Sequence, residues 1–264
     1  MSPREVAADR LSRLIVWARS AALVRRTGGR PAPLVEVAGL LLVILLFSRL
    51  HAAAGKDVAA ATANALALQS IERVLHLDIA LRANQWLTEH PALIQPAVYY
   101  YRLYYLVIIG VLVWVFVRHA DVYIKVRRTL IAMAVLVLPV FWVLPMSPPR
   151  FALPGVVDII AEHDIVGGHA SRQIEDGQNL YSAMPSMHVG WSLWCAYAVW
   201  CALRASHPRL ALLSWIFPLG MAAVVLTTGN HYVLDIAGSA VLLAVSIAVV
   251  SAWGHLAEHR RAED

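Results

Sequence analysis

The sequence predicts an all-α integral membrane protein with six transmembrane helices and amphipathic helices at the membrane surface. Its 264 residues are 59% hydrophobic and only 15% charged, a composition too apolar for an ordinary soluble domain. Six apolar stretches approach or reach the length that a helix needs to cross a hydrocarbon layer. They lie at about residues 34 to 50, 97 to 117, 129 to 146, 185 to 203, 210 to 229 and 232 to 253.

We divide the chain into three parts: a basic cytoplasmic segment (1–33), a six-helix membrane domain (34–253) and a polar tail (254–264). The first part carries seven arginines and no apolar stretch long enough for a cleavable signal. Residues 6–26 mix arginine with leucine, isoleucine and tryptophan. This pattern fits a basic amphipathic helix on an anionic membrane surface and, equally, a solvated and partly disordered tail. It gives no indication of nucleic-acid binding.

The segment from residue 52 to residue 95 is helical in composition but too polar to span. Around Ile71-Glu72-Arg73, apolar residues alternate with charged ones, as is typical of helices that lie in the membrane interface. We expect this segment to cover the site as a structural element, and its sequence assigns it no chemistry. Tyrosines then crowd residues 99–105, as in an interfacial aromatic belt. Arg102, within that run, either snorkels or contacts a substrate.

Two histidines each stand at the start of an apolar span. His188 ends the string Asn-Leu-Tyr-Ser-Ala-Met-Pro-Ser-Met-His, and His231 lies in Thr-Gly-Asn-His-Tyr-Val-Leu-Asp, which ends at Asp235. Residues i and i+4 share one face of a helix, so Asp235 can accept a hydrogen bond from one ring nitrogen of His231. That bond would fix the tautomer and leave the other nitrogen free as a base, ligand or nucleophile.

The start of a helix is also where backbone N–H groups and the helix dipole favour an anion, and phosphate is the obvious one. Pro185 suits a first helical turn, and Ser186 can donate a hydroxyl and an early helix N–H to the same anion. Two histidines suit phosphoryl transfer: His231 attacks phosphorus, while His188 protonates the departing oxygen and then deprotonates the incoming water or alcohol. This scheme needs no metal ion and no cofactor.

The order Pro185-Ser186-x-His188 and then His231-x-x-x-Asp235 resembles the two motifs of the type 2 phosphatidic acid phosphatase (PAP2) superfamily. The resemblance covers roughly residues 70 to 250. It is closest to the branch that includes inositol phosphorylceramide synthases and many bacterial membrane proteins. It implies a PAP2-like helical bundle and an enzyme that acts on a phospholipid or on a polyprenyl or sphingolipid phosphate. The residues that it marks as catalytic are His231, His188 and Asp235.

Two departures from the family pattern leave the reaction open between hydrolysis and transfer. The phosphatases of the superfamily usually carry Ser-Arg shortly before the second histidine, where this chain has Val224 and Val225. They also carry a Lys-x6-Arg-Pro element before the first motif, and its nearest counterpart here is Pro148-Pro149-Arg150, as in the synthase-like branch. The acceptor of the phospho-group is therefore either water or a lipid or sugar alcohol.

The polar loop from residue 147 to residue 184 offers anion-binding side chains. Arg150, at the end of a span, is our first choice for binding the phosphate oxygens because its guanidinium forms paired hydrogen bonds with them. Arg172 is the second choice. The loop histidines His163 and His169 lack the spacing and the cysteine partners of a metal site, so no metal ligand is predicted.

With six spans, the ends of the third and fifth lie on the same side as the starts of the fourth and sixth, so both histidine motifs and Arg150 converge. The opposite side collects 15 of the 22 lysines and arginines. By the positive-inside rule it is cytoplasmic and holds both termini. We therefore expect a protein of a bacterial plasma membrane whose site faces outward.

The alternative is a non-catalytic transporter or scaffold. A transporter should show an internal repeat or charges in the middle of its spans. The sequence has no internal repeat, and its fourth and fifth spans have no charge in the middle. The oligomeric state is left open.

Overall fold

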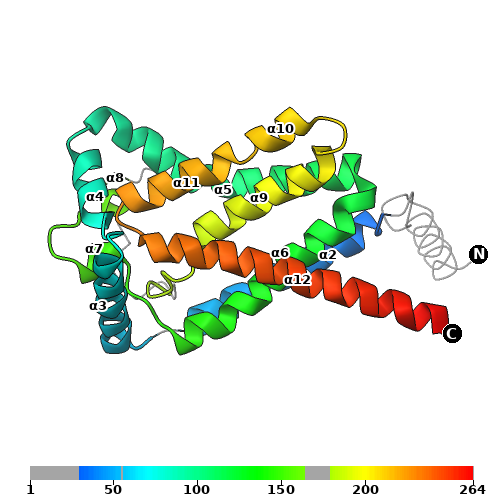
Figure 1. Cartoon of the computed structure of the whole chain (residues 1–264), viewed down its shortest axis with the longest axis horizontal. Coiled ribbons are helices and arrows are strands. Elements are labelled where there is room, and N and C mark those ends of the chain that lie inside the picture. Colours follow the sequence, from blue (N-terminus) through cyan, green and yellow to red (C-terminus); the bar gives the residue numbers. More distant parts are fainter. Residues whose placement is uncertain (1–29, 55, 164–178, 264) are drawn as a thin grey trace, which may run out of the picture.

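The computed structural model describes residues 30–54, 56–163 and 179–263. This part of the chain is all-helical (Figure 1). The predicted basic segment falls almost entirely outside it, as do His169 and Arg172. The expectations attached to those residues stay predictions.

In the described part of the chain, five segments are long and apolar enough to cross a membrane. They are α2 (Pro33–Ala53), α5 (Pro91–Arg118), α6 (Ala120–Val143), the consecutive α10 (Pro208–Leu213) and α11 (Ile216–Thr227), and α12 (Val233–Glu263). The fourth predicted span corresponds to α9 (Met187–Leu203), which has 17 residues and is shorter than these five. A sixth span is therefore not confirmed and stays a prediction.

α9 lies at the centre of the bundle, which accounts for its apolar composition on every side. It packs against α5, α6, α10, α11 and α12. Trp194 of α9 is completely buried, and its indole N–H donates a hydrogen bond to the Val126 carbonyl of α6 at 2.8 Å. Because its neighbours hold α9 on several sides, its first turn, which carries His188, is held in place as well.

α2 lies at the edge of the bundle and packs against α6. Its Glu36 is only 7% exposed and accepts hydrogen bonds from the Tyr123 hydroxyl at 2.7 Å and the Arg127 guanidinium at 2.6 Å. A charged group within an apolar helix is tolerated where it is paired. This cluster attaches α2 to α6.

Four helices gather at one end of the bundle, around the end of α11 and the start of α12 (Figure 1). They are α3 (Val58–Val74), α4 (Ala80–Thr88), α7 (Pro149–Ala152) and α8 (Ile159–His163). Buried Asn84 of α4 donates to the carbonyls of Val157 and Thr227 at 3.0 Å each and accepts the Val157 N–H at 2.8 Å. One side chain thus ties α4 to the α7–α8 connection and to the end of α11. The segment predicted as a cover does form helices over this end.

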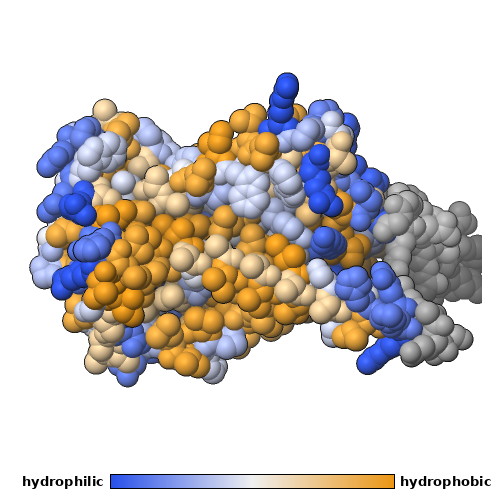
Figure 2. Space-filling view, in the orientation of Figure 1, coloured by the Kyte–Doolittle hydropathy of each residue, from blue (hydrophilic) through white to orange (hydrophobic). Residues whose placement is uncertain are grey.

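The surface has the division expected of a membrane protein. Figure 2 shows hydrophobic side chains across the middle of the visible face and hydrophilic ones toward its two ends. Large apolar side chains exposed on the long helices include Leu41, Leu45, Leu106, Val135 and Leu219. Together with the five apolar segments, this distribution defines an integral membrane protein.

Candidate active site

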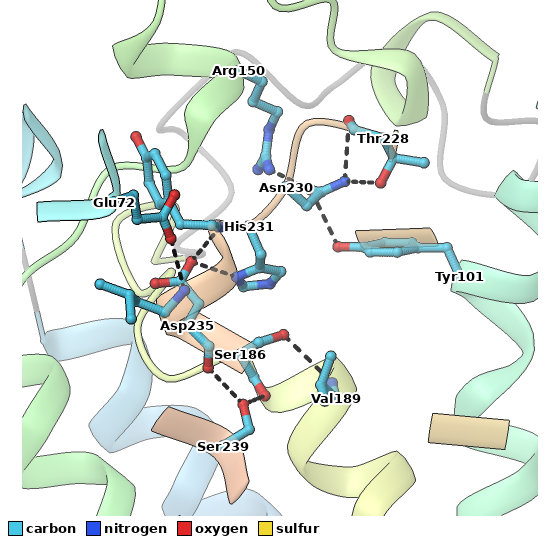
Figure 3. Close-up of polar contacts among 12 residues, drawn as sticks. Glu72, Tyr101, Arg150, Ser186, Val189, Thr228, Asn230, His231, Asp235 and Ser239 are labelled. Atoms are coloured by element: carbon cyan, nitrogen blue, oxygen red, sulfur yellow. Dashed lines mark hydrogen bonds and ion pairs between the residues drawn. The ribbon is translucent and has the colours of Figure 1, made fainter. Parts of the chain in front are cut away.

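The side chains of His231 and Asp235 meet at the start of α12. His231 Nδ1 lies 3.2 Å from Asp235 Oδ2, and the same oxygen accepts the backbone N–H of Tyr232 at 2.9 Å (Figure 3). The predicted contact is present, but it does not come from one helical face. α12 begins at Val233, so His231 precedes the helix. Asp235 reaches back from the third helical position, as the acidic residue of a capping box does.

The environment of this pair decides which nitrogen of His231 is free. Asp235 has no exposed surface and His231 is 6% exposed. Because Asp235 Oδ2 accepts the Tyr232 N–H, we assign it as the acceptor toward His231 as well, which places the His231 proton on Nδ1 and leaves Nε2 its lone pair. A neutral imidazole oriented in this way can act as a nucleophile or as a base.

His188 stands in the first turn of α9 and faces the same space. Its ring centroid is 6.1 Å from that of His231. Tyr101 of α5 stacks on the His188 ring at 4.1 Å between centroids, and Tyr104 packs against it at 4.6 Å. The predicted convergence of the two histidines is therefore present. Two members of the tyrosine run therefore hold His188. Tyr99 and Tyr105 of the same run are exposed, and the interpretation of the run as an interfacial belt stays a prediction.

The first turns of α9 and α12 are joined directly. Ser186 caps α9, with its Oγ accepting the Val189 N–H at 3.4 Å, and its own N–H donates to the Asp235 carbonyl at 3.2 Å. The Ser239 hydroxyl lies 2.7 Å from the Ser186 carbonyl oxygen and 2.9 Å from that of Asp235. These contacts fix the separation of the turns that carry the two histidines. Ser186 has no exposed surface, and its contact with a substrate stays a prediction.

The turn between α11 and α12 presents Asn230 to the site. Asn230 Nδ2 donates to Thr228 Oγ1 at 2.8 Å, and Asn230 Oδ1 accepts a short hydrogen bond from the Arg150 guanidinium (Figure 3). Gly229 has a φ of +72°, and a Cβ atom there would lie 2.6 Å from Val156 Cγ1. Glycine is therefore the residue that fits this turn. The Gly229 carbonyl accepts the Arg150 backbone N–H at 2.9 Å.

Of the arginines predicted to bind phosphate, Arg150 lies at the site. Its Nε is 3.2 Å from Oδ2 of the buried Asp158, which helps to hold the guanidinium in place. Arg102 lies beside Tyr101, with its Cζ 5.9 Å from the ring centroid. Both guanidinium groups are permanently charged. An anion bound between these groups would therefore meet positive charge.

Glu72 of α3 reaches the start of α12 from the covering helices. Its side chain is completely buried, and its Oε1 accepts the Leu234 N–H at 2.7 Å. Burial raises the pKa of Glu72, the hydrogen bond from Leu234 lowers it, and the charge of Asp235 raises it further. The interface segment thus contributes a carboxylate beside the site, which its sequence pattern did not reveal.

The assembled groups are two imidazoles, a carboxylate and an arginine. Imidazoles can attack phosphorus and move protons, and a guanidinium binds phosphate oxygens. Within the described residues, no group of three or more histidine, cysteine, aspartate or glutamate side chains is placed to hold a metal ion. Whether the reaction proceeds without one stays a prediction. A site of this composition, at one end of a helical membrane bundle, has the kinds of side chain that phosphoryl transfer requires.

Comparison with known families identifies the chain more closely. The sequence model of the PAP2 superfamily matches residues 66–249, well over half of the chain, and the protein belongs to this superfamily. Its members are generally phosphatases and phosphotransferases. No curated protein and no solved structure matches the chain. The match does not separate the branches of the superfamily, so the predicted inositol phosphorylceramide synthase-like branch stays a prediction.

Proposed function

We propose that the protein is a membrane enzyme that removes or transfers a phosphoryl-containing group on a lipid substrate, through a phosphohistidine at His231 and without a metal ion. The observation that carries the proposal is the hydrogen bond of His231 Nδ1 to Asp235, with the His188 ring 6.1 Å from His231. Membership of the PAP2 superfamily supports the same reaction class. The substrate class that suits a site at the end of an apolar bundle is a phospholipid or a polyprenyl or sphingolipid phosphate.

In the first half of the reaction, His231 Nε2 attacks phosphorus and forms a P–N bond while the P–O bond to the leaving group breaks. His188 must carry a proton at this stage, which a bound anionic substrate favours, and it gives that proton to the departing oxygen. Asp235 holds the attacking tautomer and stabilises the positive charge that develops on the ring. Arg150 neutralises the phosphoryl oxygens and exchanges its present contact with Asn230 for them.

In the second half, neutral His188 takes a proton from water or from an alcohol, whose oxygen attacks phosphorus. The P–N bond breaks, and its electron pair returns to His231. Water yields free phosphate, whereas an alcohol yields a new phosphoester. The alternative, a synthase-like transfer of a phospho-head group to a lipid or sugar alcohol, therefore uses the same residues. The Pro148-Pro149-Arg150 string and the valines at 224 and 225 favour that alternative.

We also infer that the site faces outward from a bacterial plasma membrane, with both termini in the cytoplasm. The positive-inside rule supports this orientation, because lysines and arginines are concentrated in the segments at the other side of the predicted spans. A non-catalytic transporter or scaffold with this fold is the remaining alternative of another class. It would insert in the same way and show no turnover.

The test is phosphate release by the purified protein in detergent with EDTA, across a panel of lipid phosphates and diphosphates. His231→Ala should lower the rate at least about a hundredfold because it removes the nucleophile. The matched control is His207→Ala, which truncates an exposed histidine between α9 and α10 and should keep the wild-type rate.

Release that survives EDTA and is lost only in His231→Ala supports a metal-independent phosphatase. Absence of release, together with an acid-labile phosphohistidine or with head-group exchange once an alcohol is added, supports the transferase. If wild type and His231→Ala behave alike in all three assays, the enzymatic proposal is wrong and the scaffold alternative stands.

A further inference from the structure

We propose that Glu72 is a positioning residue, which fixes the first turn of α12 from α3 and thereby holds Asp235 and His231 in their reactive arrangement. This inference rests on the function proposed above. The residue lies outside both histidine motifs, and its contact joins positions 162 residues apart in the chain.

At the start of α12, two buried carboxylates each accept a hydrogen bond from one backbone N–H group that has no partner within the helix. Asp235 Oδ2 accepts the Tyr232 N–H at 2.9 Å, and Glu72 Oε1 accepts the Leu234 N–H at 2.7 Å (Figure 3). The Leu234 N–H belongs to the peptide unit that joins Val233 to Leu234, so a hydrogen bond to it restricts the backbone one residue before Asp235. The orientation of the carboxylate that holds His231 therefore depends on a contact with a different helix.

Glu72 stands where an apolar residue would be expected. The buried face of α3 consists of Ala61, Ala65, Leu68 and then Glu72, a helical spacing in which the first three residues are apolar. A residue that served only to cover the site would continue this pattern. Placing a carboxylate with no exposed surface next to Asp235, which is also fully buried, costs free energy through desolvation and charge repulsion. This cost is explained if the carboxylate is needed at the start of α12.

The two carboxylates each keep one oxygen that makes no hydrogen bond within the described structure, Glu72 Oε2 and Asp235 Oδ1. A cavity of about 250 Å³ lies beside Glu72 and is lined by residues that include Gln69, Leu153 and Tyr232. Truncation of Glu72 removes the hydrogen bond to Leu234 and opens space next to this cavity, whose lining includes polar side chains that suit water.

The experiment compares Glu72→Ala and Glu72→Gln with a matched control, Asp57→Ala. Asp57 caps the start of the same helix by accepting the Ala60 N–H at 2.9 Å, so its truncation also removes a capping carboxylate from α3. Phosphate release is measured well below the unfolding temperature and expressed per folded molecule. Hydrogen exchange of the segment 232–236 is measured in parallel, because it reports the first turn of α12 whether or not the protein is active.

Glu72→Ala should lower kcat about tenfold or more with little change in KM, because misplaced catalytic groups slow the chemical step more than they weaken binding. It should also speed hydrogen exchange in 232–236. Glu72→Gln should restore both, since its amide oxygen can accept the Leu234 N–H as the carboxylate does. Asp57→Ala should lower only the unfolding temperature. If Glu72→Ala does not fold, Glu72→Asp, which withdraws the carboxylate by one methylene, takes its place with the same expected result.

The inference is overturned if the truncated variant keeps the wild-type kcat and exchange rate, or if Asp57→Ala lowers kcat as much. His231→Ala is run in the same assay so that the two proposals fail separately. Equal behaviour of wild type and His231→Ala in phosphate release, phosphohistidine trapping and head-group exchange contradicts the proposed function. Loss in His231→Ala with unchanged Glu72→Ala contradicts only the role of Glu72.

Discussion

At the scale of single residues, Glu72 should make stability depend on pH. Burial, with the charge of Asp235, raises its pKa above the ordinary value of 4.5 in spite of the hydrogen bond from Leu234. A raised pKa means that the folded state binds this proton more tightly than the unfolded state. The resulting stabilisation is complete below pH 4.5 and is lost as the pH rises through the raised pKa.

The glutamine in Glu72→Gln cannot ionise. The unfolding temperature of this variant, minus that of wild type, should therefore increase by a few degrees as the pH rises from 4.5 toward 8. The measurement is thermal unfolding of both proteins in the same detergent across this range. Parallel curves would show that ionisation of Glu72 costs the folded protein nothing.

Whether a site residue could be predicted from the sequence depends on how far its contacts lie from it along the chain. His188, His231 and Asp235 were predictable because each belongs to a short motif at the start of a span, and Arg150 because it closes one. Glu72 was not, because its partner is 162 residues away and its own surroundings read as an amphipathic helix. The stacking of Tyr101 on His188 was hidden in the same way, since a tyrosine at the start of a span is ordinarily an interfacial residue.

At the scale of elements, the turn between α11 and α12 depends on the backbone conformation of Gly229, and this turn precedes His231 directly. Gly229→Ala should lower the unfolding free energy by about 1 kcal/mol or more, since the residue has a φ of +72° and the new Cβ would lie 2.6 Å from Val156 Cγ1. Phosphate release should fall as well, because the Gly229 carbonyl binds the backbone N–H of Arg150.

Thermal unfolding and phosphate release of Gly229→Ala are compared with those of Gly39→Ala. Gly39 lies within α2, and a Cβ there meets nothing within 4 Å, so this control should be neutral or slightly stabilising through helix propensity. A Gly229→Ala protein as stable and active as Gly39→Ala would mean that the turn has no special backbone requirement.

Hydropathy predicted where helices lie better than where they begin and end. The third span was expected from residue 129, but α6 begins at Ala120 and carries Lys125, Arg127 and Arg128 on helical turns before the apolar stretch. The sixth was expected to end at 253, but α12 continues to Glu263. Apolar composition marks the residues that meet hydrocarbon, whereas a helix continues beyond them as long as its backbone hydrogen bonds are favourable. α9 is apolar for a different reason, its burial among five other helices, and it is only 17 residues long.

At the scale of the whole molecule, the orientation in the membrane is the property that the charge distribution predicts. The site lies at the bundle end covered by α4, whereas α10 lies toward the opposite end (Figure 1). Arg82 of α4 and Arg209 of α10 are both exposed, so cysteines at these positions report the two sides. They are introduced one at a time after Cys195 and Cys201 have been replaced by alanine.

A membrane-impermeant thiol reagent should label Arg82→Cys, and not Arg209→Cys, in right-side-out spheroplasts of a bacterial host, and the reverse in inverted vesicles. This follows because the basic loops are retained in the cytoplasm and α4 then lies outside. Labelling of Arg82→Cys in inverted vesicles only would place both histidines on the cytoplasmic side. The lipid phosphate would then have to come from the inner leaflet and its phosphate would be released inside the cell. The orientation thus decides which pool of lipid this site can reach.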